Sequence, residues 1–247
     1  MRWLQPLPRR VGRETLDHLD ENDARAIRSR RDLQRVHRVM RTRSILLHAL
    51  RQAAALAALV PGRETPLRMI ELGAGDASLM LGVARTLVRQ WPHVQLTLLD
   101  RQRVVDTRTL AAYRALGWEV EVVIADVQKW AATRSDARWD LALANLFLHH
   151  FDNAPLASLL NAIAAKSRAF VACEPRRSRF ALAGSHLIGA LGANAVTRED
   201  AVLSVHAGFR DHELSALWRR AGSWQLMEYP AAPFSHCLVA ANLGPAA

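Results

Sequence analysis

The chain has 247 residues, of which 50% are apolar and 23% charged, and its formal net charge is +10. That length fits one large α/β domain, and no run reaches the roughly 18 apolar residues that a membrane-spanning helix needs. The first residues lack the apolar stretch and cleavage site of a signal peptide, so we expect a cytoplasmic protein. The excess of positive charge is best explained by a solvated arginine surface. The alternative explanation is a surface that binds nucleic acid or another anionic partner.

Residues 1–65 show helical periodicity and contain no strand-like run. Apolar side chains recur three or four positions apart within Leu33–Met40 and Ile45–Leu50, which is the spacing of one helix face. Arginines occupy much of the remaining surface between residues 25 and 43. We expect two or three helices that end near Pro61-Gly62 and form an N-terminal extension or cap.

From residue 66 onward, short apolar runs alternate with helical stretches, which is typical of βαβ units and a largely parallel sheet. We predict strands at 67–72, 94–99, 120–125, 139–145 and 168–173, with helices between them. A helix from Asp211 to Gly222 and a strand pair at 224–229 and 234–241 follow. Residues 66–247 are therefore predicted to form a Rossmann-like α/β domain with helices on both faces of its sheet.

The first predicted strand runs into Glu71-Leu72-Gly73-Ala74-Gly75-Asp76-Ala77 and continues into a helix. Glycines at such a turn permit positive φ and let a nucleotide-like ligand approach the backbone closely. Glu71 and Asp76 would repel a pyrophosphate, and Ser78 stands where a dinucleotide motif has its third glycine. The two carboxylates suit a ligand that carries an ammonium and a sulfonium group.

Two further carboxylates follow the next predicted strands. Asp100 closes the second strand, where an acidic residue accepts hydrogen bonds from ribose hydroxyls. Asp126 follows the third strand and could accept from an adenine amino group. Each of these residues could instead cap a helix or a turn. Their positions at successive strand ends of one sheet favour an adenosine ligand with a positive charge.

These residues resemble the motifs of the class I S-adenosylmethionine (SAM)-dependent methyltransferases, and the resemblance covers roughly residues 67–242. Glu71–Gly75 looks like their glycine motif, Asp100 like their ribose carboxylate, and Ala125-Asp126 like their adenine-side pair. The segment Leu146–Phe151 is similar to the small-molecule branch, which includes quinone-biosynthesis methyltransferases. Ala77 departs from the family, in which many members have a third glycine, and we expect alanine to cost little room there.

The resemblance implies a cofactor, a strand order and a set of contacts. The cofactor is SAM, with S-adenosylhomocysteine as the product, and the sheet has seven strands in the order 3-2-1-4-5-7-6 with strand seven antiparallel. Cys173 and Cys237 then lie near each other, and we favour two unpaired buried thiols over a disulfide. The expected cofactor-binding residues are Glu71, Gly73, Ala74, Gly75, Asp76, Asp100, Arg101, Asp126, Val127, Asn145 and Leu146.

The methyl acceptor is expected beyond the carboxyl ends of strands four and five, where His149, His150 and Glu174 stand. Histidine can remove a proton near neutral pH, so both histidines are candidate catalytic bases, with His149 preferred. The alternative is that both are structural. No metal site is expected.

Residues 176–210 form too long a segment for a simple crossover and have the composition of a mobile apolar lid. Its candidate substrate-binding residues, each of which could equally be a surface or capping residue, are His186, Asn194, His206 and Phe209. The arginines at 176, 177 and 179 could bind an anionic group of the acceptor or form a solvated turn.

The sequence therefore predicts an O- or C-methyltransferase of a small apolar or aromatic metabolite, acting as a monomer or a homodimer. One alternative is an RNA or DNA methyltransferase that uses the arginine-rich helices as a phosphate platform. Aromatic residues that could stack on bases do not interleave these arginines, which disfavours nucleic acid. A SAM-binding protein without catalytic activity is the other alternative.

Overall fold

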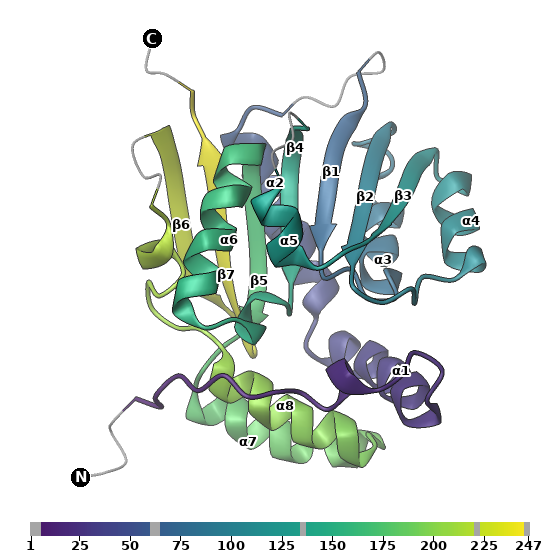
Figure 1. Cartoon of the computed structure of the whole chain (residues 1–247), viewed down its shortest axis with the longest axis vertical. Helices are drawn as coiled ribbons and strands as arrows, with labels where there is room; N and C mark the ends of the chain where they lie inside the picture. The colour runs from purple at the N-terminus through teal and green to yellow at the C-terminus, as the bar shows by residue number, and fades with distance from the viewer. Residues whose placement is uncertain (1–5, 60–64, 134–136, 220–222, 245–247) are drawn as a thin grey trace.

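Seven strands form one sheet in the order β3-β2-β1-β4-β5-β7-β6 (Figure 1). The computed structural model describes residues 6–59, 65–133, 137–219 and 223–244. The strands β1 to β5 are parallel, and β7 is antiparallel to both β5 and β6. The predicted order and the antiparallel seventh strand are confirmed. The strand bounds are β1 Leu67–Leu72, β2 Val94–Asp100, β3 Trp118–Ile124, β4 Trp139–Asn145, β5 Ser167–Pro175, β6 Trp224–Ala231 and β7 Ser235–Asn242.

Helices cover both faces of the sheet because side chains alternate between the two faces of each strand. In β4, Leu141 and Leu143 pack in one hydrophobic cluster, whereas Ala142 and Ala144 pack in the other. The first cluster is completed mainly by α2 (Thr42–Leu56), α3 (Ser78–Leu87) and α4 (Thr107–Ala115), and the second mainly by α5 (Val127–Ala132) and α6 (Asn153–Lys166). Cys173 and Cys237 are directly paired across β5 and β7, and both are buried free thiols.

Helix α2 belongs to the sheet domain and not to an N-terminal extension. Its side chains Leu46, Leu50 and Ala53 are fully buried in the same hydrophobic cluster as β5 and β7. The boundary that we expected near residue 65 therefore does not separate two packing units. The break comes earlier, at Arg41, which adopts a left-handed conformation between α1 (Ala24–Val39) and α2.

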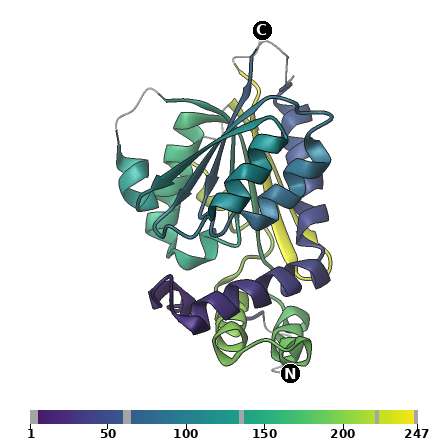
Figure 2. The ribbon, with the colours of Figure 1, turned by 90° about the vertical axis from the view of Figure 1, so that its right-hand side faces the viewer.

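The carboxyl ends of the strands are covered by a layer that we call the cap. It consists of residues 6–18, which include the 3₁₀ turn η2 (Leu16–His18), together with α1, α7 (Arg179–Leu187), η4 (Ile188–Leu191) and α8 (Ala195–Ala207). Figures 1 and 2 show this layer below the sheet, with α1 beside α7 and α8. The predicted insert at 176–210 is thus largely helical.

Two aspartates hold the cap together. Asp32 of α1 is buried and accepts a hydrogen bond from the backbone N–H of Asn194, 2.7 Å away, at the start of α8. Asp200 of α8 accepts the backbone N–H groups of Thr15 and Leu16 at 2.7 and 2.9 Å. Because buried carboxylates need such partners, these contacts fix residues 6–18 and α1 against α8.

One predicted helix is wrong. Residues 211–219 form turns and the short 3₁₀ segment η5 (Ser215–Leu217), and Gly222, the expected end of that helix, lies outside the described residues. Asp211, the expected cap, has φ +52°, which is not the extended conformation of a helix N-cap. Among the described helices, none combines the length and apolar character needed to cross a bilayer.

Candidate active site

A cavity of about 1070 Å³ lies between the carboxyl edge of the sheet and the cap. Its volume is slightly above the roughly 300–1,000 Å³ typical of small-molecule sites, so there is room for more than one ligand. The eleven residues that we predicted to bind a cofactor all line this cavity. They are Glu71, Gly73, Ala74, Gly75, Asp76, Asp100, Arg101, Asp126, Val127, Asn145 and Leu146.

The two glycines of the first turn have different structural roles, although both have positive φ. A Cβ at Gly73 would lie 2.2 Å from the ring of Phe147, so this position has no room for a side chain. A Cβ at Gly75 would meet nothing within 4 Å. Gly73 therefore serves packing, and Gly75 leaves open space along the backbone for a ligand.

Ala77 also has a left-handed backbone, with φ +56°. Our expectation considered only the room for a methyl group. The structure shows that the backbone conformation is the reason why glycine suits this position, because a left-handed residue with a Cβ costs about 1–2 kcal/mol. The carbonyl of Ala77 accepts a hydrogen bond from the buried Tyr113 hydroxyl at 3.0 Å, which helps to hold this conformation.

Asp100 and Asp76 organise the turn from two sides. Asp100 accepts the N–H of Gly75 on Oδ2 at 2.8 Å and that of Gln102 on Oδ1 at 2.9 Å. Each carboxylate oxygen has a second lone pair, so Asp100 can still accept from a diol. Asp76 accepts the N–H of Ser78 and the side-chain amide of Gln34, both at 2.9 Å. Since Gln34 is on α1, Asp76 joins the turn to the cap.

Three buried oxygens that line the cavity have no hydrogen-bond partner in the described part of the chain: Glu71 Oε2, Asn145 Oδ1 and Thr197 Oγ1. Burial, reinforced by the nearby charges of Asp76 and Asp100, raises the pKa of Glu71 to about 8. Buried polar atoms without partners are rare in folded proteins. Their position here indicates a polar ligand, and Glu71 in particular favours a cationic group.

Asp126 caps α5 and still faces the cavity. Its Oδ1 accepts the N–H groups of Gln128 and Lys129 at 2.9 and 3.0 Å. The capping alternative considered from the sequence is therefore correct. It does not exclude ligand binding, because no hydrogen bond to Oδ2 is found among the described residues.

Glu174 orders the segment that follows β4. The chain leaves Asn145 through Leu146, a non-glycine residue with φ +51°. Glu174 Oε1 then accepts the N–H groups of Phe147 and Leu148 at 3.0 and 2.9 Å. Glu174 is completely buried and does not line the cavity, so the predicted direct contact with substrate is wrong. Its function is to position η3 (Leu148–His150).

His149 is held between two carboxylates. Its Nδ1 lies 2.8 Å from Glu174 Oε2, and its Nε2 lies 3.2 Å from Glu14 Oε1. Burial alone would lower the pKa of His149, but hydrogen bonds and charges from the two glutamates outweigh it and raise this pKa to about 10. Both ring nitrogens are engaged and the ring is charged at neutral pH. This geometry does not suit the general-base role that we preferred for His149.

His150 is the more open of the two histidines and also lines the cavity. Its Nδ1 lies 3.3 Å from Asp17 Oδ2, and its ring centroid lies 4.3 Å from that of His149. Burial and the adjacent positive charge of His149 lower the pKa of His150. A neutral imidazole can accept a proton or bind a metal ion.

The remaining predicted substrate residues do not line the cavity. His186 is exposed on α7, Asn194 caps α8 through the N–H of Thr197, and the carbonyl of His206 accepts from Arg10 N. Phe209 is buried under the Arg9 guanidinium, 4.5 Å from its ring centroid.

Sequence reasoning missed Glu14 and Asp17, which both line the cavity. Glu14 contacts a residue 135 positions away, and no local pattern in residues 6–18 predicts that contact.

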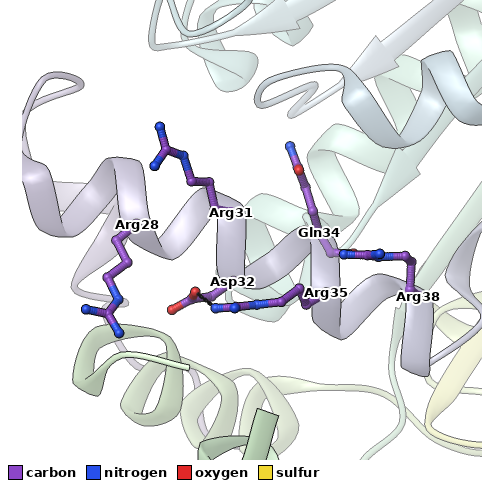
Figure 3. Close-up of a pocket in the computed structure, with 6 residues that line it drawn as sticks. All are labelled: Arg28, Arg31, Asp32, Gln34, Arg35 and Arg38. Carbon is purple, nitrogen blue, oxygen red and sulfur yellow. Dashed lines mark hydrogen bonds and ion pairs between the residues drawn. The ribbon is translucent and has the colours of Figure 1, made fainter. Parts of the chain in front are cut away.

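The arginine-rich surface of α1 is separate from this cavity. A shallow groove of about 490 Å³ is lined there by Arg28, Arg31, Asp32, Gln34, Arg35 and Arg38 (Figure 3). Asp32 pairs with Arg35, and the four arginines are exposed. No aromatic side chain lines the groove, so it offers charge without a platform for base stacking.

No protein family model and no curated protein sequence matches the chain. Solved structures do match it. The plantazolicin methyltransferase BpumL, solved in complex with S-adenosylhomocysteine (SAH), has a TM-score of 0.57 and 12% sequence identity, with 90% of this chain and 91% of that chain covered. The chain has a methyltransferase fold. An O-methyltransferase family protein from Burkholderia thailandensis has a TM-score of 0.52 and 16% identity, over 83% of this chain and 59% of that chain. The SAM-dependent methyltransferase SibL, in its apo form, has a TM-score of 0.50 and 19% identity, over 76% of this chain and 53% of that chain.

Proposed function

We propose that this protein is a SAM-dependent methyltransferase that acts on oxygen or carbon of a small, largely apolar or aromatic acceptor. The observation that carries the proposal is the convergence of eleven sequence-selected residues on one cavity, where Glu71 and Asn145 present buried oxygens that have no hydrogen-bond partner among the described residues. The methyltransferase fold and the presence of SAH in the BpumL structure support it.

In this proposal the cofactor occupies the part of the cavity along the ends of β1 to β4, which we call the cofactor half. Asp100 accepts the ribose hydroxyls while it holds Gly75, and Asp126 accepts from the adenine amino group. Glu71 faces the ammonium group, which favours its ionised form. When bound, SAM supplies a methyl group already activated by its sulfonium. The residues of this half bind and orient the cofactor.

The acceptor occupies the rest of the cavity, which we call the acceptor half. Its walls come from residues 6–18, η3 and the cap helices, and its apolar lining includes Leu33, Val36, Ile188 and Val205. These side chains exclude water and suit an apolar or aromatic compound. The polar side chains of this half include Glu14, His149 and His150. Positioning the acceptor against the methyl group accounts for much of the rate enhancement expected of such a site.

The nucleic-acid alternative is less well supported. The arginine groove on α1 does not share the cavity's lining except at Gln34. If the phosphate backbone of a nucleic acid bound in that groove, its target base would have to pass through the cap to reach the cavity. Binding of tRNA that weakened steeply with salt would favour this alternative.

The proposal is tested by calorimetric titration with SAH. Asp100→Asn removes the charge from the ribose contact, and the loss of charge-assisted hydrogen bonds predicts on the order of a hundredfold weaker binding. Asp106→Asn is the matched control, because Asp106 caps α4 through Thr109 and does not line the cavity. No binding of SAH to the unmodified protein, or equal effects of the two substitutions, would contradict the proposed function.

A further inference from the structure

Three metal-ligating side chains meet at the wall of the acceptor half. Glu14, His149 and His150 each offer one ligand atom, and these atoms all lie within 4.8 Å of one another. Among the described residues, no other group of three or more His, Cys, Asp and Glu side chains meets this spacing. All three line the cavity.

Each of these side chains has a second polar partner that fixes its orientation. Glu174 holds Nδ1 of His149 at 2.8 Å, which directs Nε2 toward Glu14. Asp17 lies 3.3 Å from Nδ1 of His150, and Ser204 Oγ donates to Glu14. Histidines that bind metals almost always give their other nitrogen to a carboxylate, a carbonyl or water, and such partners are part of the site's construction.

We propose that Glu14, His149 and His150 bind a divalent transition-metal cation of the Zn²⁺ type. Two imidazoles and one carboxylate are a ligand set of catalytic zinc sites, which keep a further position open, whereas Mg²⁺ and Ca²⁺ prefer oxygen ligands throughout. The cation takes the place between Nε2 of His149 and Glu14 that a shared proton occupies without it. The movement needed is small, because the ligand atoms are already close.

Because all three side chains line the cavity, a further coordination position would open toward the acceptor half. It would be filled by an oxygen atom of the acceptor, such as a hydroxyl or a carboxylate, which narrows the acceptor to an oxygen-bearing compound that can chelate or bind a cation. This assignment of the acceptor rests on the proposed function. Binding of the cation itself does not, since it depends only on the three side chains and their partners.

The experiment uses protein without a histidine tag, stripped with a chelator and dialysed, and titrates Zn²⁺ by calorimetry. Co²⁺ absorption reports the ligand field independently of activity. We expect one Zn²⁺ per chain. His150→Ala and Glu14→Gln should each weaken Zn²⁺ binding by on the order of a hundredfold, whereas His186→Ala on the exposed face of α7 should leave it unchanged.

Circular dichroism shows whether each variant is folded, and titration with SAH shows whether it still binds the proposed cofactor product. His149 is buried between Glu14 and Glu174, so His150→Ala and Glu14→Gln are the better variants for a folded protein. If Zn²⁺ does not bind, or if folded His150→Ala binds it as well as His186→Ala does, the metal site is wrong. Zn²⁺ binding without SAH binding would leave the metal site standing and overturn the proposed function.

Discussion

The two halves of the cavity are constructed differently. The cofactor half is built from residues at the carboxyl ends of β1 to β4 and in the turns that follow them, and several of its hydrogen bonds are local, such as those that Asp76 accepts from Ser78 and Asp126 accepts from Gln128. The acceptor half is assembled from segments far apart in the chain, such as Glu14 and His149. The cofactor half is thus fixed mainly by the sheet, with a single link from Asp76 to Gln34 of the cap among the hydrogen bonds described above, whereas the acceptor half depends on how the cap packs against the sheet.

The contrast explains where sequence reasoning about such a site succeeds. Parallel strands bring their carboxyl ends to one edge, so an acidic residue at a strand end can be placed from the order of strands along the chain. No comparable rule predicts where the side chains of the cap lie. Their positions follow from contacts such as Asp32 with Asn194 and Asp200 with Thr15, which form only in the folded chain.

The largest effect is expected where the two halves touch, at Gly73 and Phe147. Gly73→Ala should lower the free energy of unfolding by about 3–5 kcal/mol, because overpacking against Phe147 adds to the cost of a left-handed alanine. Gly75→Ala has no such clash and should cost only about 1–2 kcal/mol. Urea unfolding of both variants measures the difference.

Equal stability of the two variants would show that Phe147 does not pack as described. It would also remove the physical link between the glycine turn and η3.

A smaller effect is expected from the charge of Glu71 in the cofactor half. Its pKa of about 8 means that the carboxyl group is largely protonated at pH 6, and a cationic ligand favours the ionised form. SAH affinity should therefore rise between pH 6 and pH 8, by at most about tenfold per pH unit. Calorimetric titration across this range measures it, and Glu71→Gln should flatten the dependence.

The raised pKa of Glu71 also predicts how the free energy of unfolding depends on pH. The folded protein keeps a proton on Glu71 that the unfolded chain loses above its ordinary pKa of 4.5. The contribution of Glu71 to the free energy of unfolding therefore falls as pH rises from about 4.5 to about 8. A Glu71→Gln protein with an unchanged stability profile over this window would show that the group is not buried as described.

The smallest effect is a gain in stability at Ala77. Ala77→Gly removes the Cβ from a left-handed residue, but it also removes a buried methyl group and adds the entropy of glycine in the unfolded chain, so the free energy of unfolding should rise by less than about 1 kcal/mol. Thermal unfolding with the Ala74→Gly variant as a control measures this gain. A loss of more than about 1 kcal/mol in Ala77→Gly would contradict the left-handed conformation of this residue, because loss of the methyl group and glycine entropy would then act without any relief of strain.

Individual residues show which parts of the fold and the site could be predicted from the sequence. Strands β1 and β4 have the predicted bounds because each is a short, largely apolar run that stops at a clear signal, the glycine turn after Leu72 in β1 and the polar Asn145 in β4. The sequence also placed Glu71, Asp100 and Asp126 at the cavity. It failed at α2, whose arginines and position before the glycine turn suggested an extension, although its apolar face packs on the sheet.

His149 and His150 line the acceptor half as expected, but the substrate-binding residues predicted in the insert do not line the cavity. Asn194 and Phe209 are polar and aromatic residues in an insert, a combination typical of binding sites, yet one caps α8 and the other is buried under Arg9. The pairing of His149 with two glutamates could not be predicted, because Glu14 lies in a segment without regular periodicity.

A crystal structure of the protein grown with SAH would test the proposed cofactor site without relying on any variant. We predict that the adenosine lies along the strand ends between Asp100 and Asp126 and the amino group near Glu71, with the sulfur directed toward the acceptor half lined by His150. SAH bound elsewhere, or bound in the cavity without contact to Asp100 and Glu71, would contradict the proposed function.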